Sequence, residues 1–167
     1  MLAGYGLVLL MGTGNYFGTR FGFAAFFAAA AAMCVVVSMS ELGSRLTIER
    51  HVARPWATIV LTLAVWQAGF QLGKSSAARG RSRFDRVWVD FRDLFGVVWA
   101  RRIADRVNEA AAQGNWPVRL ASWGFVPIDP HGPEFNAEQS AQVEQTLRWL
   151  LRRFVDPEWI DERMKDT

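Results

Sequence analysis

The chain has 167 residues, 51% of them hydrophobic, and its 19 basic and 16 acidic residues give a net charge of +3, a size that suits one domain or two small ones. Residues 1–73 contain four basic and two acidic residues, whereas residues 74–167 contain fifteen and fourteen, and this mixing of signs argues against a nucleic-acid surface. The only cysteine is Cys34, which excludes an intrachain disulfide and a thiolate metal cluster.

Two apolar segments begin the chain. Residues 2–18 are short, apolar and rich in glycine, and residues 21–40 contain the run AAFFAAAAAMCVVVS, which has no charged side chain. The second segment has about the length that crosses a hydrocarbon core of about 30 Å, so it predicts a transmembrane helix. No Lys or Arg precedes Arg20, which argues against a cleaved signal peptide. Because the apolar run begins at Met1, we expect either the carboxyl-terminal part of a longer membrane protein or a misassigned start.

A third apolar segment, residues 56–72, predicts another transmembrane helix, with Trp56 as an interfacial anchor. The membrane region is therefore expected to comprise residues 1–73, with three spans, or two if the first segment inserts only halfway. A basic linker, residues 74–81, follows. Its charges and the next arginine form a membrane-surface basic flank: Lys74, Arg79, Arg81 and Arg83. Basic residues next to transmembrane helices are enriched on the cytoplasmic side of the membrane. We therefore expect the carboxyl-terminal domain in the cytoplasm, at a bacterial-type inner (plasma) membrane.

The soluble domain is expected at residues 82–167, organised around one helix of about 45 Å over residues 82–114. Ser82 and Asp85 form a capping-box-like start, and Gly114 suits a left-handed C-cap. Its large apolar residues recur at steps of three and four: Phe84, Val87, Trp88, Phe91, Leu94, Phe95, Val98, Ile103 and Val107. Its charged residues are expected on a solvent-exposed face: Arg86, Asp90, Asp93, Arg101, Asp105 and Glu109.

The rest of the domain is predicted to pack onto this helix. Residues 116–125 alternate partly and predict one extended segment, followed by a turn-rich loop with three prolines. Asn136 caps a further helix whose apolar stripe ends near Phe154, and Pro157 begins a last short helix. The predicted fold class is therefore mainly α, with two or three transmembrane helices before a small helical domain.

No catalytic, cofactor-binding or metal site is predicted. Asp129, His131 and Glu134 are metal-ligand types within six positions, but the only other histidine, His51, lies between two apolar segments. The sequence GKSS at residues 73–76 lacks the strand and the glycine spacing of a phosphate-binding loop. The two histidines lie in no nucleophile motif, so no enzyme activity is assigned.

Function is therefore inferred from architecture. We expect a membrane-anchored accessory or interaction subunit that contacts the bilayer and a protein partner, or a second copy of itself. The alternative is a fragment or small subunit of a transporter or of a membrane-bound biogenesis enzyme complex. A lone strand would leave backbone groups unpaired, so its aromatic and apolar side chains predict the partner contact: Trp116, Leu120, Trp123 and Phe125.

Overall fold

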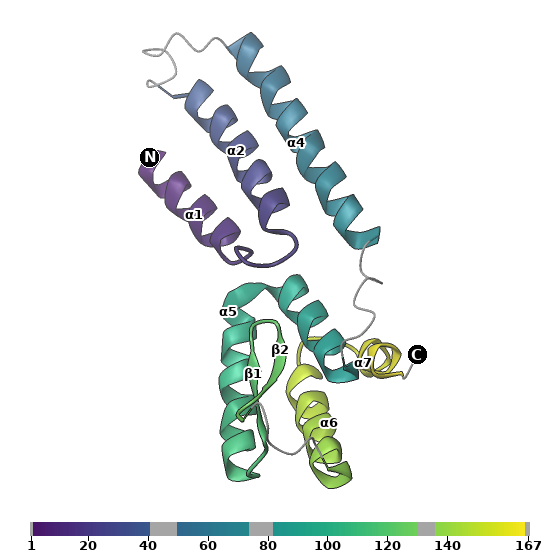
Figure 1. Cartoon of the computed structure of the whole chain (residues 1–167). Helices are drawn as coiled ribbons and strands as arrows, with labels where there is room; N and C mark the ends of the chain where they lie inside the picture. The colour runs from purple at the N-terminus through teal and green to yellow at the C-terminus, as the bar shows by residue number, and fades with distance from the viewer. Residues whose placement is uncertain (1, 41–49, 74–81, 130–135, 166–167) are drawn as a thin grey trace. The chain divides into compact units, whose positions relative to one another are not determined.

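The computed structural model describes residues 2–40, 50–73, 82–129 and 136–165. The described residues are mainly helical and include one antiparallel sheet of two strands (Figure 1). The chain divides into two compact units, Met1–Ala77 and Ala78–Thr167, here called unit 1 and unit 2. The mainly α fold class predicted from the sequence is confirmed.

Unit 1 contains the helices α1 (Leu2–Gly14), α2 (Gly22–Ser38) and α4 (Arg50–Gly73), and α2 packs against both of the others. The residues buried in this unit are small. They recur at intervals of seven or four, which places them on one face of each helix. Small residues allow two helix backbones to approach closely. The buried residues of α2 are Ala24, Ala31 and Ser38, and those of α4 are Ala53, Ala57 and Ala64.

Within the described residues, no helix has both the length and the hydropathy of a membrane-spanning segment. α1 and α2 contain 13 and 17 residues, whereas about 20 are typical of a transmembrane helix. α4 has 24 residues, but Arg50, Arg54, Gln67 and Gln71 lower its hydropathy. The three predicted spans are helical, yet the structure does not support their assignment as transmembrane helices.

Unit 2 is built around α5 (Arg83–Gln113), which contacts α6, α7 and both strands, as the sequence predicts. The backbone N–H of Asp85 donates to the Ser82 hydroxyl oxygen at 3.2 Å, so the predicted N-cap is confirmed. Six residues of the predicted apolar stripe are buried: Phe84, Val87, Trp88, Phe91, Ile103 and Val107.

The prediction that α5 is one continuous helix is wrong. Gly96 has φ 80° and ψ 173°, and it interrupts the helix so that two segments meet at a bend (Figure 1). Only glycine adopts this conformation readily, because it has no Cβ. Leu94 and Val98, which lie on either side of the bend, are exposed although the helical period predicts them in the core.

The predicted left-handed C-cap at Gly114 is also wrong. Gly114 has φ −85°, and it is the next residue, Asn115, that has a positive φ of 48°. A Cβ atom at residue 114 would lie 2.5 Å from Nε1 of Trp116. Glycine is therefore required here by the close approach of the Trp116 ring and not by backbone conformation.

Residues 116–125, predicted as one extended segment, in fact contain the first strand of a hairpin, its turn and the beginning of the second strand. β1 (Val118–Ala121) pairs antiparallel with β2 (Gly124–Pro127), with Ala121 opposite Gly124 and Val118 opposite Pro127. The two-residue turn of Ser122 and Trp123 lacks the Asn-Gly signal of common hairpins, so the sequence gives little sign of it. A Cβ at Gly124 would lie 2.4 Å from the Asp85 carboxylate, which restricts this position to glycine.

α6 (Ala137–Leu151) and α7 (Pro157–Met164) complete unit 2 and begin as the sequence predicts. Asn136 and Gln139 form a reciprocal capping box, and Pro157 is the first residue of α7. Arg163 of α7 binds Asp90 of α5 at 2.8 Å, so Asp90 does not lie on a purely solvated face. The side chains that α6 and α7 bury in the core are Val143, Leu147, Leu150, Leu151, Ile160 and Met164.

Candidate functional site

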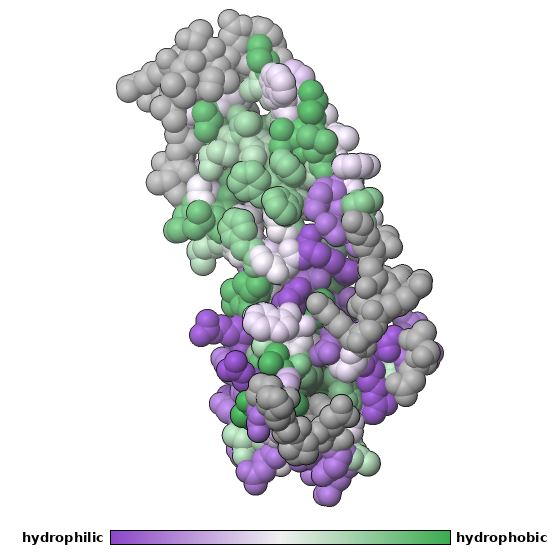
Figure 2. Space-filling model, viewed as in Figure 1, coloured by the Kyte–Doolittle hydropathy of each residue, from purple (hydrophilic) through white to green (hydrophobic). Residues whose placement is uncertain are grey.

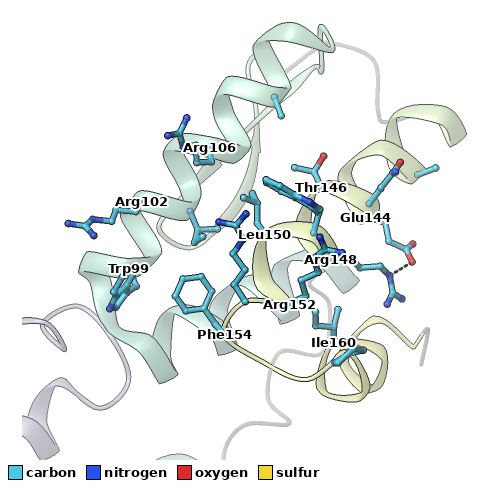
Figure 3. Close-up of a pocket in the computed structure, with 17 residues that line it drawn as sticks. Trp99, Arg102, Arg106, Glu144, Thr146, Arg148, Leu150, Arg152, Phe154 and Ile160 are labelled. Carbon is cyan, nitrogen blue, oxygen red and sulfur yellow. Dashed lines mark hydrogen bonds and ion pairs between the residues drawn. The ribbon is translucent and has the colours of Figure 1, made fainter.

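Unit 2 contains an open groove of about 1350 Å³ between the second segment of α5 and the helices α6 and α7 (Figure 3). Its walls combine arginine and tryptophan side chains, so we call it the Arg–Trp groove. The lining residues are Trp99, Arg102, Ile103, Arg106, Ala110, Ala141, Glu144, Gln145, Thr146, Arg148, Trp149, Leu150, Arg152, Arg153, Phe154, Pro157 and Ile160.

The groove has an apolar floor. Ile103, Leu150 and Ile160 are buried, and the half-buried ring of Phe154 meets the Trp99 ring edge to face at a centroid distance of 5.3 Å. Phe154 also contacts the ring of Phe91 at 5.5 Å, which joins the floor to the core of the unit. This surface can cover an apolar side chain of a ligand and is supported from behind by packed residues.

Two tryptophans at the groove are each accompanied by an arginine. The guanidinium of Arg102 lies 5.1 Å from the Trp99 ring centroid, and that of Arg153 lies 5.0 Å from the Trp149 ring. Trp99 is 42% exposed and Trp149 is 48% exposed, so both rings are accessible. A cation above an aromatic face is attracted by the ring quadrupole, and this limits the orientations of the guanidinium while its N–H groups remain available.

Five arginines line the groove, against one carboxylate, Glu144. Arg148 binds Glu144 at 3.0 Å and also pairs with Asp161 of α7. The hydrogen bond to Asp161 is the largest cause that raises the pKa of Arg148, and the hydrogen bond to Glu144 raises it further. Arg106 binds Glu109 at 2.9 Å on the surface. The structure places no carboxylate of the described residues within ion-pair distance of the other three, which are Arg102, Arg152 and Arg153.

The chemistry of the Arg–Trp groove favours binding. Its lining contains no histidine or cysteine, and Thr146 carries its only hydroxyl group. Glu144 is bound to both Arg148 and Arg83, the latter at 3.2 Å, so its carboxylate is held as an ion-pair partner. No group of three or more His, Cys, Asp or Glu residues suited to a metal ion occurs within the described ranges. His131 and Glu134 lie outside those ranges.

The structure changes the basis of the partner contact predicted at the hairpin. Trp116 and Leu120 are buried in the core, Phe125 is half-buried, and Trp123 is 62% exposed. Of the four predicted residues, Trp123 alone presents most of its side chain to solvent. The other three contribute mainly to the stability of unit 2.

The hairpin backbone is paired by side chains of α5, so it does not need a partner for this purpose. Trp88 Nε1 donates to the carbonyl of Ala121 at 2.8 Å, and Asp85 accepts from the backbone N–H of Phe125 at 2.7 Å. Asn108 both donates to and accepts from the backbone of Leu120, at 3.0 and 2.7 Å. The expectation of a lone strand with unpaired backbone groups is wrong, because β2 pairs with β1 and side chains of α5 bond further backbone groups of the hairpin.

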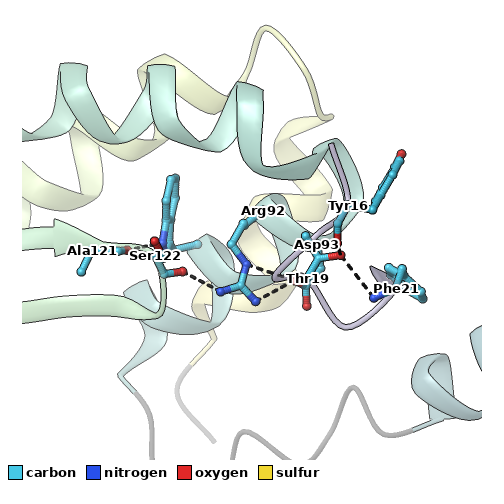
Figure 4. A network of polar contacts seen from close by, with 8 residues as sticks. Tyr16, Thr19, Phe21, Arg92, Asp93, Ala121 and Ser122 are labelled. Atoms are coloured by element: carbon cyan, nitrogen blue, oxygen red, sulfur yellow. Dashed lines mark hydrogen bonds and ion pairs between the residues drawn. The ribbon is translucent and has the colours of Figure 1, made fainter. Parts of the chain in front are cut away.

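A buried ion pair lies beside the bend in α5 (Figure 4). Arg92 donates from Nε and Nη2 to the same carboxylate oxygen of Asp93, at 3.1 and 2.7 Å, and from Nη1 to the carbonyl of Ser122 at 2.7 Å. Asp93 is only 2% exposed, which corrects its predicted place on the solvated face of α5. The pair links α5 to the hairpin turn and has a structural role.

Unit 1 presents a second surface of interest. Many of its large apolar side chains are exposed, and Figure 2 shows one face of the unit on which green, apolar residues predominate. Water-soluble monomers rarely expose such large apolar patches, which typically mark contact with a membrane or a protein. The exposed residues are Tyr5, Leu7, Val8, Leu10, Met11, Phe17, Phe23, Phe26, Val35, Met39, Val52, Trp56, Ile59, Leu61, Leu63, Val65, Trp66 and Phe70.

The residues of the predicted basic flank are only partly described. Lys74, Arg79 and Arg81 lie outside the described residues. Arg83 is the first residue of α5, and its guanidinium binds Glu144 and lies 4.9 Å from the Phe84 ring centroid. Arg83 therefore also contributes to packing between α5 and α6.

Sequence reasoning missed the Arg–Trp groove, although part of its signal is visible. Arg102 and Arg106 are four residues apart on α5, as are Arg148 and Arg152 near the end of α6, so each pair shares one side of its helix. The sequence does not reveal that these two sides line the same groove.

Searches against family models, curated proteins and solved structures gave no match to the chain.

Proposed function

We propose that the chain is a membrane-anchored accessory subunit, in which unit 1 inserts into a lipid bilayer and unit 2 recruits a partner protein at the membrane surface. The proposal assigns no catalytic step to the chain. Its alternative, a small part of a transporter or biogenesis enzyme complex, differs in that the active residues would lie on the associated chain.

The observation that carries the proposal is the inverted burial pattern of unit 1. Small residues such as Ala31 and Ala57 are buried between its helices, while large apolar residues such as Leu63 and Trp66 are exposed. In water, folding buries large apolar side chains, because each one removed from solvent contributes about 1.5–3 kcal/mol. In lipid that driving force is absent, and helices associate through small residues that permit close packing. The burial pattern of unit 1 is typical of helices that associate in lipid.

The proposed mode of insertion takes account of both the lengths and the hydropathy of the helices. Since no described helix has the length and hydropathy of a transmembrane segment, we propose that the helices of unit 1 enter the bilayer together through their outer surface. Trp56 and Trp66, which are 60% and 68% exposed, are amphipathic residues suited to the headgroup region. The basic residues Lys74, Arg79 and Arg81 would then meet anionic headgroups on the cytoplasmic side.

Membrane fractionation with a reporter tests this proposal. The full chain is expressed in a bacterium with a reporter that is active only in the cytoplasm fused after Thr167. We expect an active reporter that sediments with the membranes and stays there after an alkaline carbonate wash. Release of the chain by the wash would contradict insertion. Activity only of a periplasm-dependent reporter at the same position would contradict the orientation.

A further inference from the structure

We propose that the Arg–Trp groove of unit 2 binds an acidic polypeptide segment that also carries apolar side chains. This inference rests on the proposed function, because it gives the chemistry of the partner that unit 2 recruits. It differs from the hairpin contact predicted from the sequence, since it places the docking surface on α5 and α6.

The charge of the groove is the first reason. Arg102, Arg152 and Arg153 line it without an ion-pair partner among the described residues. A guanidinium offers a planar pair of N–H donors that matches a carboxylate, and such charge-assisted hydrogen bonds are stronger than neutral ones. Acidic side chains on a partner therefore complement these three groups.

The apolar floor is the second reason. Ile103, Leu150 and Phe154 form a surface that a purely anionic ligand would leave unused. The exposed rings of Trp99 and Trp149 extend this surface toward the rim. A segment that alternates acidic with apolar residues can place carboxylates on the arginines and apolar side chains between the tryptophans. Aromatic residues and arginine are the types enriched at protein interfaces.

The size of the groove and the charge of the whole unit favour a polypeptide over the other anionic ligands. The groove volume of about 1350 Å³ exceeds the roughly 300–1,000 Å³ of typical small-molecule pockets. Single-stranded nucleic acid also binds to arginine and stacked aromatic rings, but its binding sites lie on strongly basic surfaces. Residues 78–167 contain fourteen basic and fourteen acidic residues, so unit 2 lacks this excess of positive charge.

Fluorescence anisotropy on the detergent-solubilised full chain tests the inference. The first probe is a fluorescein-labelled peptide in which pairs of glutamates alternate with single leucines or tryptophans. The second is the same peptide with lysine in place of glutamate, and the third is an oligothymidine of equal length. We expect binding of the glutamate peptide only, weakened by added NaCl because the contacts are between charges. Preferential binding of oligothymidine, or no binding of the glutamate peptide, would overturn the inference.

Matched variants locate the binding to the groove. The double variant Arg102→Gln/Arg153→Gln is expected to bind the glutamate peptide at least about tenfold more weakly, because it removes two charged hydrogen-bond donors. Arg101→Gln is the control, since Arg101 is exposed on α5 and does not line the groove. Equal loss in both variants would mean that only the general charge of the unit matters, and would overturn the assignment.

A tryptophan pair provides an independent readout. Trp149→Ala is expected to weaken peptide binding, whereas Trp123→Ala in the hairpin turn is expected to leave it unchanged, although Trp123 is the more exposed residue. The reverse result would place the docking surface at the hairpin. These measurements use no membrane, so their failure would refute the peptide inference and leave bilayer insertion by unit 1 to its own test.

Discussion

Replacing Phe91 by alanine is expected to lower the free energy of unfolding of unit 2 by about 3–5 kcal/mol. The Phe91 side chain has no exposed surface, and its ring stacks on Phe95 at 4.8 Å and meets Phe154 edge to face at 5.5 Å. Truncation removes the buried ring and leaves a cavity at a place where α5 and the turn after α6 meet. Because small domains have total stabilities of about 5–15 kcal/mol, this loss is a large share.

The measurement is urea unfolding of the full chain in detergent, monitored by near-ultraviolet circular dichroism. Ile128→Ala is the control, because Ile128 is 65% exposed and surface truncations usually change stability by less than about 0.5 kcal/mol. Similar losses in the two variants would contradict the assignment of Phe91 to the core of unit 2.

Replacing Asp93 by alanine is expected to cost about 3–5 kcal/mol, comparable to the loss at Phe91. The variant removes the carboxylate that accepts two hydrogen bonds from Arg92, whose side chain is only 14% exposed. A buried cation that loses its partner keeps its desolvation penalty without the compensating attraction. The loss should also loosen the hairpin turn, since Arg92 holds the Ser122 carbonyl at 2.7 Å.

Asp105→Ala is the matched control for Asp93. Asp105 lies on the same helix, is exposed, and has no ion pair with another described residue, so its removal should change the free energy of unfolding little. A double-mutant cycle between Arg92 and Asp93 isolates the pair itself. A coupling energy near zero would show that Asp93 is important for another reason than its contact with Arg92.

The parts of unit 2 that the sequence predicted are those determined by neighbouring residues. The capping box of Asn136 and Gln139, the N-cap of Ser82 and the proline at the start of α7 depend on residues within one helical turn. Four members of the apolar stripe predicted for α6, Val143, Leu147, Leu150 and Leu151, are buried as expected, whereas Phe154 lies after the end of the helix and is half-buried.

The features that were missed depend on contacts between distant segments. Gly96 is compatible with a helix at a modest cost, so nothing local predicted that it would bend α5. Asn108 looks like a surface residue of a helix, yet it pairs with the backbone of Leu120. The Arg–Trp groove likewise forms only when α5 and α6 pack together, which brings Arg102 and Arg148 to one cavity.

Unit 1 shows the limit of hydropathy as a guide. Its apolar composition predicted transmembrane spans, but the described helices do not meet the length and hydropathy of such spans. What composition could not reveal is which residues face outward. The structure adds that the buried residues of unit 1 are small, whereas many of its large apolar residues are exposed.

The most direct test of bilayer insertion uses Cys34, the only cysteine of the chain, which is exposed on α2 and can be labelled without mutation. A nitroxide is attached to Cys34 of the full chain, the chain is reconstituted in vesicles, and collisions with oxygen and with a water-soluble nickel complex are compared. Oxygen concentrates in the hydrocarbon core, whereas the nickel complex stays in water. We expect the label to collide far more with oxygen than with nickel; nickel accessibility equal to that of a label in buffer would contradict insertion of unit 1.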